Sequence, residues 1–199
     1  MISISKIPND VPYTLFKNYY DLAIESKQES IEAIAISSLN HTSREVESRM
    51  VNLKYINNNE WIFFSNFNSL KARNFSEHNQ ISALFFWSSI NVQIRMKAKI
   101  VKTSSNFSDE HYKNRTTEKN ALAHSSMQSE KIASYDLVIQ NYHKALESSK
   151  EVLTRPANWG GYSFTPYYFE FWEGHESRLN KRDVYEISEG NWIHTILQP

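Results

Sequence analysis

The sequence contains no cysteine among its 199 residues. Disulfide frameworks, thiolate metal sites and cysteine nucleophiles are therefore excluded together. Glycine-rich phosphate loops, HExxH and GxSxG motifs and metal-spaced sets of carboxylates are absent as well. No metal site is predicted, and the commonest hydrolase and nucleotide-binding signatures do not apply.

The chain also lacks a net charge and a long apolar run. Lys plus Arg equal Asp plus Glu at 22 each, so there is no global basic field to attract nucleic acid. The longest apolar run, ALFFW at 83–87, is far too short to span a bilayer, and MISISKIPND lacks a charged leader followed by an apolar stretch. We therefore expect a soluble, cytoplasmic protein that binds neither nucleic acid nor membrane.

The composition that remains is that of a folded domain. Apolar residues make up 40% of the chain and aromatic residues 14%, and a chain of this length buries roughly 70% of its unfolded surface. The sequence has no internal repeat and no low-complexity linker. We expect a single domain over residues 1–199.

Hydrophobic periodicity predicts both helices and strands. Residues 12–26 place Leu15, Tyr19, Leu22 and Ala23 on one face of an amphipathic helix, and 69–79 read as a short helix beginning after a serine cap. Residues 108–149 read as two or three polar helices. Strands are expected at 31–39, 48–56, 61–67, 81–89 and 91–103, and again after Pro156. The class that follows is α+β, with six or more antiparallel strands closed into a barrel and flanked by helices.

Glycine is scarce and unevenly placed. The chain has only four glycines, and three of them, Gly160, Gly161 and Gly174, fall within RPANWGGYSFTPYYFEFWEGHESRLNKR at 155–182. Elsewhere asparagine takes the place of glycine in turns, as at 57–59, because asparagine tolerates the left-handed conformation. A tight hairpin with no ligand nearby would explain the local glycine cluster equally well.

The side chains that could carry chemistry are mostly cations and amides near strand ends. The seven histidines are scattered, and each one taken alone favours a structural or solvated role. The remaining candidates are Arg49, Lys54, Lys71, Gln93, Arg115, Gln128, Arg178 and Arg182. Taken one at a time, each of these is an ordinary surface residue.

Taken together, they resemble the pyridoxamine 5'-phosphate oxidase family. The segments SRMVNLK, FFSNFNSLKAR, the Gln93 strand, SSMQSE, RPANWGGY, FEFWEG and SRLNKR occur in the order and spacing of that family, from about residue 12 to the terminal LQP. The resemblance implies a single FMN-binding split β-barrel domain with an N-terminal helix and a helical insertion at about 108–150. It also implies a homodimer that binds FMN at the subunit interface, and a sharp chain reversal at WGGY beside the flavin.

The resemblance also implies a set of flavin-binding positions. Arg49 and Lys71 would hold the phosphate, with Ser65 where a threonine is usual. Trp172 would pack near the ring and Arg182 would stabilise the reduced flavin. The full predicted cofactor set is Arg49, Met50, Val51, Lys54, Phe64, Ser65, Lys71, Gln93, Gln128, Ser129, Trp172 and Arg182. Leu70 departs from the family, where an arginine precedes the lysine.

The substrate side matches less well. Lys54 and Arg115 keep two of the family's phosphate-binding positions, while His111 stands for a tyrosine and Lys119 for a serine. Of the two positions that would act on the substrate ring, Arg178 matches. Asn180 replaces a histidine, and an asparagine can bond a ring hydroxyl but cannot titrate.

Three functions stay open. The first is an FMN-dependent oxidase that passes a hydride from an amine or alcohol carbon to flavin N5 and reduces molecular oxygen to hydrogen peroxide, with pyridoxine or pyridoxamine 5'-phosphate as the default small-molecule substrate and a place in pyridoxal phosphate biosynthesis. The second is a related oxidase of another aromatic substrate, as in phenazine biosynthesis. The third is a flavin-binding protein without oxidase activity.

Overall fold

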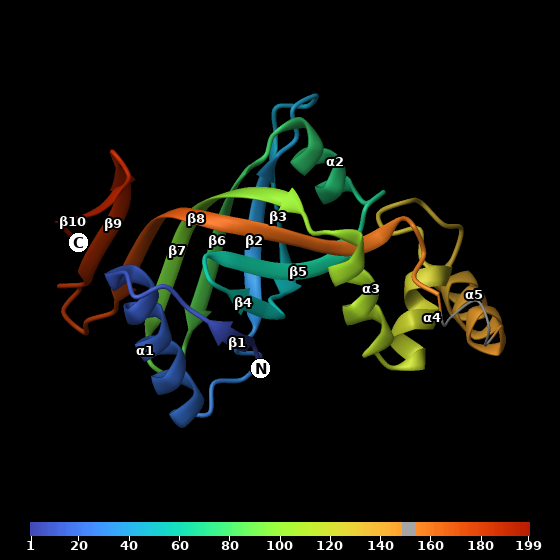
Figure 1. The fold of residues 1–199 in the computed structure, drawn as a ribbon, viewed down its shortest axis with the longest axis horizontal. Helices are drawn as coiled ribbons and strands as arrows, with labels where there is room; N and C mark the ends of the chain where they lie inside the picture. Colours follow the sequence, from blue (N-terminus) through green and yellow to red (C-terminus); the bar gives the residue numbers. More distant parts are fainter. Residues whose placement is uncertain (149–153) are drawn as a thin grey trace.

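A strongly curled β-sheet forms the centre of the computed structural model, which describes residues 1–148 and 154–199 (Figure 1). The described strands are β1 (Ser3–Lys6), β2 (Ala33–Leu39), β3 (Val46–Asn52), β4 (Tyr55–Asn57), β5 (Glu60–Asn66), β6 (Gln80–Trp87), β7 (Val92–Lys102), β8 (Trp159–Glu173), β9 (Lys181–Ser188) and β10 (Asn191–Ile196). They follow the order β1-β4-β5-β8-β7-β6-β2-β3, and the β9–β10 hairpin joins the sheet through β8. The predicted α+β split-barrel class is confirmed.

The long strand β8 organises this sheet because it pairs along its length with β5, β7 and β9. Its neighbour β7 alternates buried and partly exposed residues as its sequence predicts, with Ile94, Met96 and Ala98 wholly buried. Aromatic side chains fill the interior: Trp61, Phe63, Phe85, Phe164 and Phe169 are all inaccessible to solvent. The core therefore lies inside the curl of the sheet.

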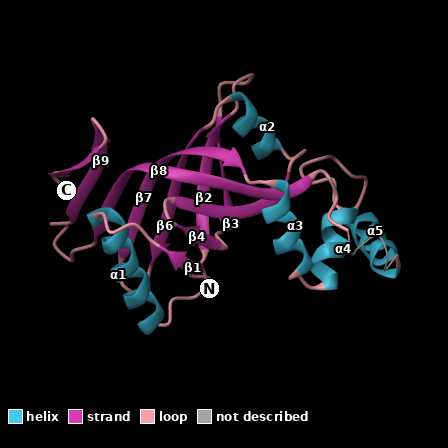
Figure 2. Ribbon diagram, in the orientation of Figure 1, coloured by secondary structure: helices cyan, strands magenta, loops and turns pink. Residues whose placement is uncertain are grey.

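Helix α1 (Val11–Glu25) packs across one opening of this core and begins with Pro12 in its first turn, where a missing N–H is harmless (Figure 2). Its buried face is centred on Tyr13, Phe16 and Tyr20. The predicted face was wrong at Leu22, which is 49% exposed. The aromatic residues, which offer more apolar area, turn toward the core instead.

Three of the remaining helices gather at the opposite end from the C-terminal hairpin. Helix α2 (Leu70–Glu77) follows β5, while α3 (Ser105–Lys113), α4 (Thr117–Ser125) and α5 (Tyr135–Glu147) follow β7. Figure 1 shows α3, α4 and α5 clustered at one end of the long axis and β9 with β10 at the other. The predicted helical stretch 108–149 is thus three helices, and its last residue, like the end of the predicted insertion at 150, lies outside the described residues. No helix in the described ranges is long and apolar enough to cross a membrane.

Three local predictions need correction. The strand expected at 48–56 is interrupted at Leu53 and Lys54 and becomes β3 and β4. The first strand, β1, was not predicted, and it pairs parallel to β4 in an otherwise antiparallel sheet. The expected chain reversal at WGGY is wrong, because Trp159, Gly160 and Gly161 open the continuous strand β8.

Candidate active site

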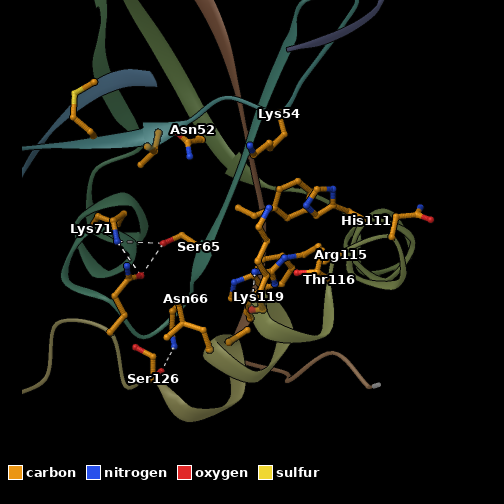
Figure 3. Close-up of a pocket in the computed structure, with 18 residues that line it drawn as sticks. Asn52, Lys54, Ser65, Asn66, Lys71, His111, Arg115, Thr116, Lys119 and Ser126 are labelled. Atoms are coloured by element: carbon orange, nitrogen blue, oxygen red, sulfur yellow. Dashed lines mark hydrogen bonds between the residues drawn. The ribbon is translucent and has the colours of Figure 1, made fainter. Parts of the chain in front are cut away.

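A cavity of about 530 Å³ lies where the ends of β3 and β5 meet helices α2, α3 and α4. Four cationic side chains line it, namely Lys54, Lys71, Arg115 and Lys119, and among the described residues no aspartate or glutamate does. Figure 3 shows these cations on opposite walls, with Lys71 facing the others across the cavity. An excess of positive charge in a concave site favours an anionic ligand.

Lys71 is the most unusual of these cations. Its side chain is buried, and its Nζ donates to three neutral oxygens: Ser65 Oγ and Ser69 Oγ at 3.2 Å and Gln128 Oε1 at 3.1 Å. No carboxylate of the described residues pairs with it. Burial and then the positive charge of Arg49 lower the pKa of Lys71 to about 8. The ammonium group of Lys71 is thus kept out of water without a counter-ion from the described residues.

Arg49 borders a second cavity of about 470 Å³, which shares Met50, Lys71 and Gln128 with the first. Its guanidinium is already engaged. Nη2 donates to Glu47 Oε2 at 3.0 Å, and Nη1 donates to Ser38 Oγ at 2.8 Å and to the Glu47 carbonyl at 2.9 Å. Lys71 and Arg49, predicted to share one anion, therefore lie together but differ in their partners.

An aromatic wall forms the other side of the first cavity. The rings of Phe64 and His111 stack with centroids 3.6 Å apart, and Trp159 stacks on Phe64 at 5.3 Å. The Arg115 guanidinium lies 4.2 Å from the centroid of Trp159. A cation held over an aromatic face is fixed in direction without losing its charge to a carboxylate. The wall therefore presents both flat apolar surface and positive charge.

His111 is held in its neutral form at physiological pH. Burial, followed by the charges of Arg115, Lys54 and Lys119, lowers the pKa of His111 to about 4. Its Nδ1 lies 2.8 Å from the Tyr55 hydroxyl. If that hydroxyl donates to Nδ1, the other ring nitrogen carries the proton and is a donor. His111 can then donate one hydrogen bond to an anion but adds no charge.

The C-terminal members of the predicted set lie elsewhere. Gln93, Trp172 and Arg182 form one row across β7, β8 and β9, because Gln93 pairs with Trp172 and Trp172 pairs with Arg182. Directly paired residues of antiparallel strands point to the same face. Arg182 is held by the buried carboxylate of Glu170, to which its Nη2 donates at 2.7 Å and its Nε at 2.9 Å. None of these residues lines either cavity.

Arg178 and Asn180 lie in the loop between β8 and β9. Arg178 is exposed and adopts a left-handed conformation with φ of 63°, which costs a non-glycine residue energy. Asn180 Oδ1 accepts a hydrogen bond from the His175 backbone N–H at 3.0 Å. Within a single chain, neither residue lines either cavity, and the Asn180 side chain stabilises the loop in which it lies.

Several lining residues escaped the sequence prediction. They are Asn52, Asn66, Asn114, Thr116, Leu122, Ala123, Ser126 and Trp159 in the first cavity, and Glu47 and Ser48 in the second, where Leu70 lies at the flavin position noted as a departure from the family. Trp159 had a signal, because it belongs to the WGGY segment. Asn66 is buried and its amide donates to the Ser126 carbonyl at 3.2 Å. Only the fold brings these two together.

Comparison with known proteins decides the family. A pyridoxine/pyridoxamine 5'-phosphate oxidase of Christiangramia forsetii is 34% identical over 97% of this chain and 90% of its own length. One from Hydrogenovibrio crunogenus is 31% identical over 94% of this chain and 88% of its own length. The chain belongs to the pyridoxine/pyridoxamine 5'-phosphate oxidase family. The family model described as the pyridoxine 5'-phosphate oxidase C-terminal dimerisation region matches residues 159–199.

Two solved structures agree with the fold. PhzG from Burkholderia lata, in complex with tetrahydrophenazine-1-carboxylic acid, superposes with a TM-score of 0.89 at 26% identity, over 96% of this chain and 94% of its own. An FMN-binding, pyridoxamine 5'-phosphate oxidase-related protein of Nostoc punctiforme superposes with a TM-score of 0.78, covering 96% of this chain and all of its own. At 12% identity, the second match speaks for the fold alone. Both structures therefore cover nearly the whole of this chain.

Proposed function

We propose that this chain is an FMN-dependent oxidase of an anionic aromatic substrate. The observation that carries the proposal is the buried ammonium of Lys71, which has only neutral hydrogen-bond partners among the described residues. A buried charge without a counter-ion is costly, and a phosphate would supply the missing anion. Relatives at more than 30% identity over nearly the whole chain support the same reading.

The surroundings of Lys71 fit the phosphate end of FMN. Ser65 Oγ lies 3.1 Å from Gln128 Oε1, so a serine, a lysine and an amide converge on one point. The second cavity opens beside them and includes Arg49 and Ser129. Met50, Val51 and Phe64 line the first cavity and would contact the ribityl chain and ring. These residues bind and orient the cofactor.

A complete site requires two copies of the chain. Gln93, Trp172 and Arg182 share one face of the sheet but line neither cavity. Arg182 belongs to β9, and Figure 1 shows β9 at the opposite end of the long axis from α3 and α4, the helices that supply part of the first cavity. The matched dimerisation region, residues 159–199, contains Trp172 and Arg182. We therefore place FMN between two subunits, with the cavity of one facing the C-terminal row of the other.

The remaining cations would hold the substrate. Lys54, Arg115 and Lys119 provide charge for a phosphate or carboxylate, and His111 offers a neutral donor. Arg178 of the second subunit would position the donor carbon, with Asn180 beside it. Bound FMN would supply a hydride acceptor at N5 for an amine or alcohol carbon, and molecular oxygen would take up the two electrons with protons to give hydrogen peroxide. The default substrate is pyridoxamine or pyridoxine 5'-phosphate.

One observation favours a different aromatic substrate. Of the three departures at the substrate positions, His111, Lys119 and Asn180, two are engaged within the chain. His111 lies 2.8 Å from the Tyr55 hydroxyl, and Asn180 accepts a hydrogen bond from the His175 backbone. PhzG, a structural relative at 26% identity, holds a phenazine carboxylic acid in its complex. A carboxylated ring is therefore the second candidate for the same cationic cavity.

Anaerobic reduction separates these functions. The FMN-loaded protein is mixed without oxygen with pyridoxamine 5'-phosphate, pyridoxine 5'-phosphate or a dihydrophenazine carboxylate, and the flavin band at about 450 nm is followed. We expect bleaching by a phosphorylated pyridine and recovery on admitting oxygen. Bleaching only by the phenazine donor would select the second candidate. A flavin-loaded protein that no donor bleaches would contradict the oxidase proposal and leave a flavin-binding protein.

A further inference from the structure

A carboxylate lies at the phosphate end of the proposed flavin site. Glu47 and Arg49 are two residues apart on β3, so their side chains leave the same face of the strand. They form an ion pair, with Arg49 Nη2 lying 3.0 Å from Glu47 Oε2. Both residues line the second cavity together with Lys71 and Gln128.

Most of the hydrogen-bond donors that Arg49 could offer a ligand are already engaged within the chain. Nη1 donates to Ser38 Oγ, to the Glu47 carbonyl and to the Ile36 carbonyl at 3.2 Å. Nη2 donates to Glu47 Oε2. Among the described residues, Nε makes no hydrogen bond. A phosphate that approaches Arg49 therefore meets a guanidinium whose Nη2 already donates to a carboxylate.

The charges that line the second cavity also indicate that Glu47 opposes phosphate binding. The second cavity has Arg49 and Lys71 as its cations and Glu47 as its only acidic lining residue within the described ranges. Leu70, which also lines it, adds no charge. The carboxylate cancels one of the two positive charges, so a phosphate dianion finds a net charge of one instead of two. Like charges placed close together oppose binding.

Few contacts hold the Glu47 side chain, so it can move away from Arg49. Its other contact is from the Asn40 amide to Oε1 at 3.5 Å, the limit for a hydrogen bond, and its side chain is 27% exposed. Arg49, by contrast, is anchored by Ser38 and two backbone carbonyls and is 19% exposed. When the two separate, it is the glutamate that turns toward water.

We infer that Glu47 is a built-in competitor for the phosphate-binding site, so that FMN must displace its carboxylate from Arg49 in order to bind. The inference rests on the proposed flavin site and adds a residue that tunes it. The carboxylate weakens the binding of a flavin that carries a phosphate and leaves the binding of a flavin without one unchanged.

The test compares two flavins on two variants. Apoprotein is titrated with FMN and with riboflavin, which lacks the phosphate, and the quenching of flavin fluorescence gives each dissociation constant. We expect Glu47→Gln to bind FMN about tenfold more tightly than wild type, a change that corresponds to about 1.4 kcal/mol. Riboflavin affinity should stay the same. Glu47→Ser provides a second variant without the carboxylate, with the same expectation.

Glu45→Gln is the matched control. Glu45 is exposed in the connection just before β3 and forms no ion pair among the described residues, so this variant removes an equal charge from the same end of the strand. FMN affinity should change less than twofold in the control, an expectation for an exposed charge screened by salt. An equal gain in Glu45→Gln and Glu47→Gln would mean a general charge effect and would overturn the inference.

The remaining outcomes separate the inference from the proposal beneath it. If wild type binds FMN and Glu47→Gln binds it no more tightly, the inference is wrong and the flavin site stands. An equal gain for FMN and riboflavin would also overturn it, because the effect would not involve the phosphate. If neither wild type nor any variant binds either flavin, the proposed function itself fails.

Discussion

Lys71 is the residue on which the account depends. Its ammonium is buried, donates to Ser65, Ser69 and Gln128, and has no acidic partner in the described part of the chain. Such a group either loses its proton or receives an anion. The pKa of Lys71, lowered to about 8, reflects the tendency to lose the proton. We propose that the FMN phosphate is the anion that Lys71 receives.

FMN affinity should therefore weaken as pH rises above about 8. The free protein releases the Lys71 proton near pH 8, whereas the bound phosphate requires the charged form, so binding takes up a proton above that pH. The dissociation constant should rise by up to about tenfold per pH unit between about pH 8 and pH 9.5. Fluorescence titration of apoprotein measures it.

Lys71→Arg is the matched variant for this titration. Arginine keeps its charge throughout this pH range, so the variant should show little change in FMN affinity from about pH 7 to pH 9.5. Riboflavin, which has no phosphate, should bind wild type without this dependence. A wild-type FMN affinity that is constant across the range would show that the Lys71 charge does not hold the phosphate.

His111 makes a prediction about stability in acid. The pKa of His111 is lowered from 6.5 to about 4, chiefly by burial. Between these two values the unfolded chain holds a proton on this residue that the folded chain does not, so acid favours unfolding. The free energy of unfolding should fall as pH drops from about 6.5 to 4, and His111→Phe should lose less stability over that range. Urea denaturation at several pH values gives both slopes, and equal slopes would contradict the burial of a neutral His111.

At the scale of elements, the glycines of β8 are explained by close packing. Of the four glycines only Gly190 has a positive φ, 82°. A Cβ at Gly161 would lie 2.6 Å from Thr103 Oγ1 and 2.9 Å from Thr103 Cγ2, and one at Gly160 would lie 2.6 Å from Phe67 Cζ. The WGGY segment thus allows side chains to cross the start of β8 close to the backbone.

Substitution of Gly161 tests that explanation. Gly161→Ala should lower the free energy of unfolding by roughly 1–3 kcal/mol, as overpacking usually does. In a Thr103→Ala background, which removes both of the nearest atoms, the same substitution should cost clearly less. Urea denaturation of the four proteins in this cycle gives the coupling. An equal cost in both backgrounds would mean that contact with Thr103 is not what requires glycine.

The elements that sequence predicted well are those decided by local patterns. The alternation of β7 follows from which face each residue presents, and the turn between β4 and β5 uses Asn58 with φ of 53°, as the asparagine-rich segment predicts. Strand β1 was missed because it is only four residues long and its partner, β4, is far along the chain. Glu47 lies one residue before the strand predicted at 48–56. Because β3 begins earlier, at Val46, Glu47 and Arg49 leave the same face of one strand.

The site was predictable from resemblance and hardly at all from periodicity. Lys71 and Gln128 are 57 residues apart, and no local pattern joins a helix residue to a loop at that distance. Both residues entered the predicted flavin site because the order of the sequence segments matches that of the family. The same matching could not reveal that Arg49 is paired with a carboxylate, or that Trp159 carries Arg115 over its ring, because these depend on the contacts of this chain.

At the scale of the whole molecule, the predicted flavin residues divide into two groups. Arg49, Lys71 and Gln128 surround the cavities near the helical end, whereas Trp172 and Arg182 stand on β8 and β9. A symmetric dimer that joins the two groups would contain two equivalent sites, each built from both chains. Each chain would then depend on its partner to hold FMN.

Complementation between two defective variants tests this claim most directly. Lys71→Met removes the phosphate contact, and a Trp172→Ala, Arg182→Ala double variant removes the ring contacts, so each protein alone should bind FMN at least about tenfold more weakly than wild type. In a mixed dimer, one site combines the intact halves of both chains. After equal amounts are denatured and refolded together, about a quarter of all sites should bind FMN with wild-type affinity. If the mixed dimers form, as native mass spectrometry would show, and no tight site returns, then FMN is not held between two chains by these residues.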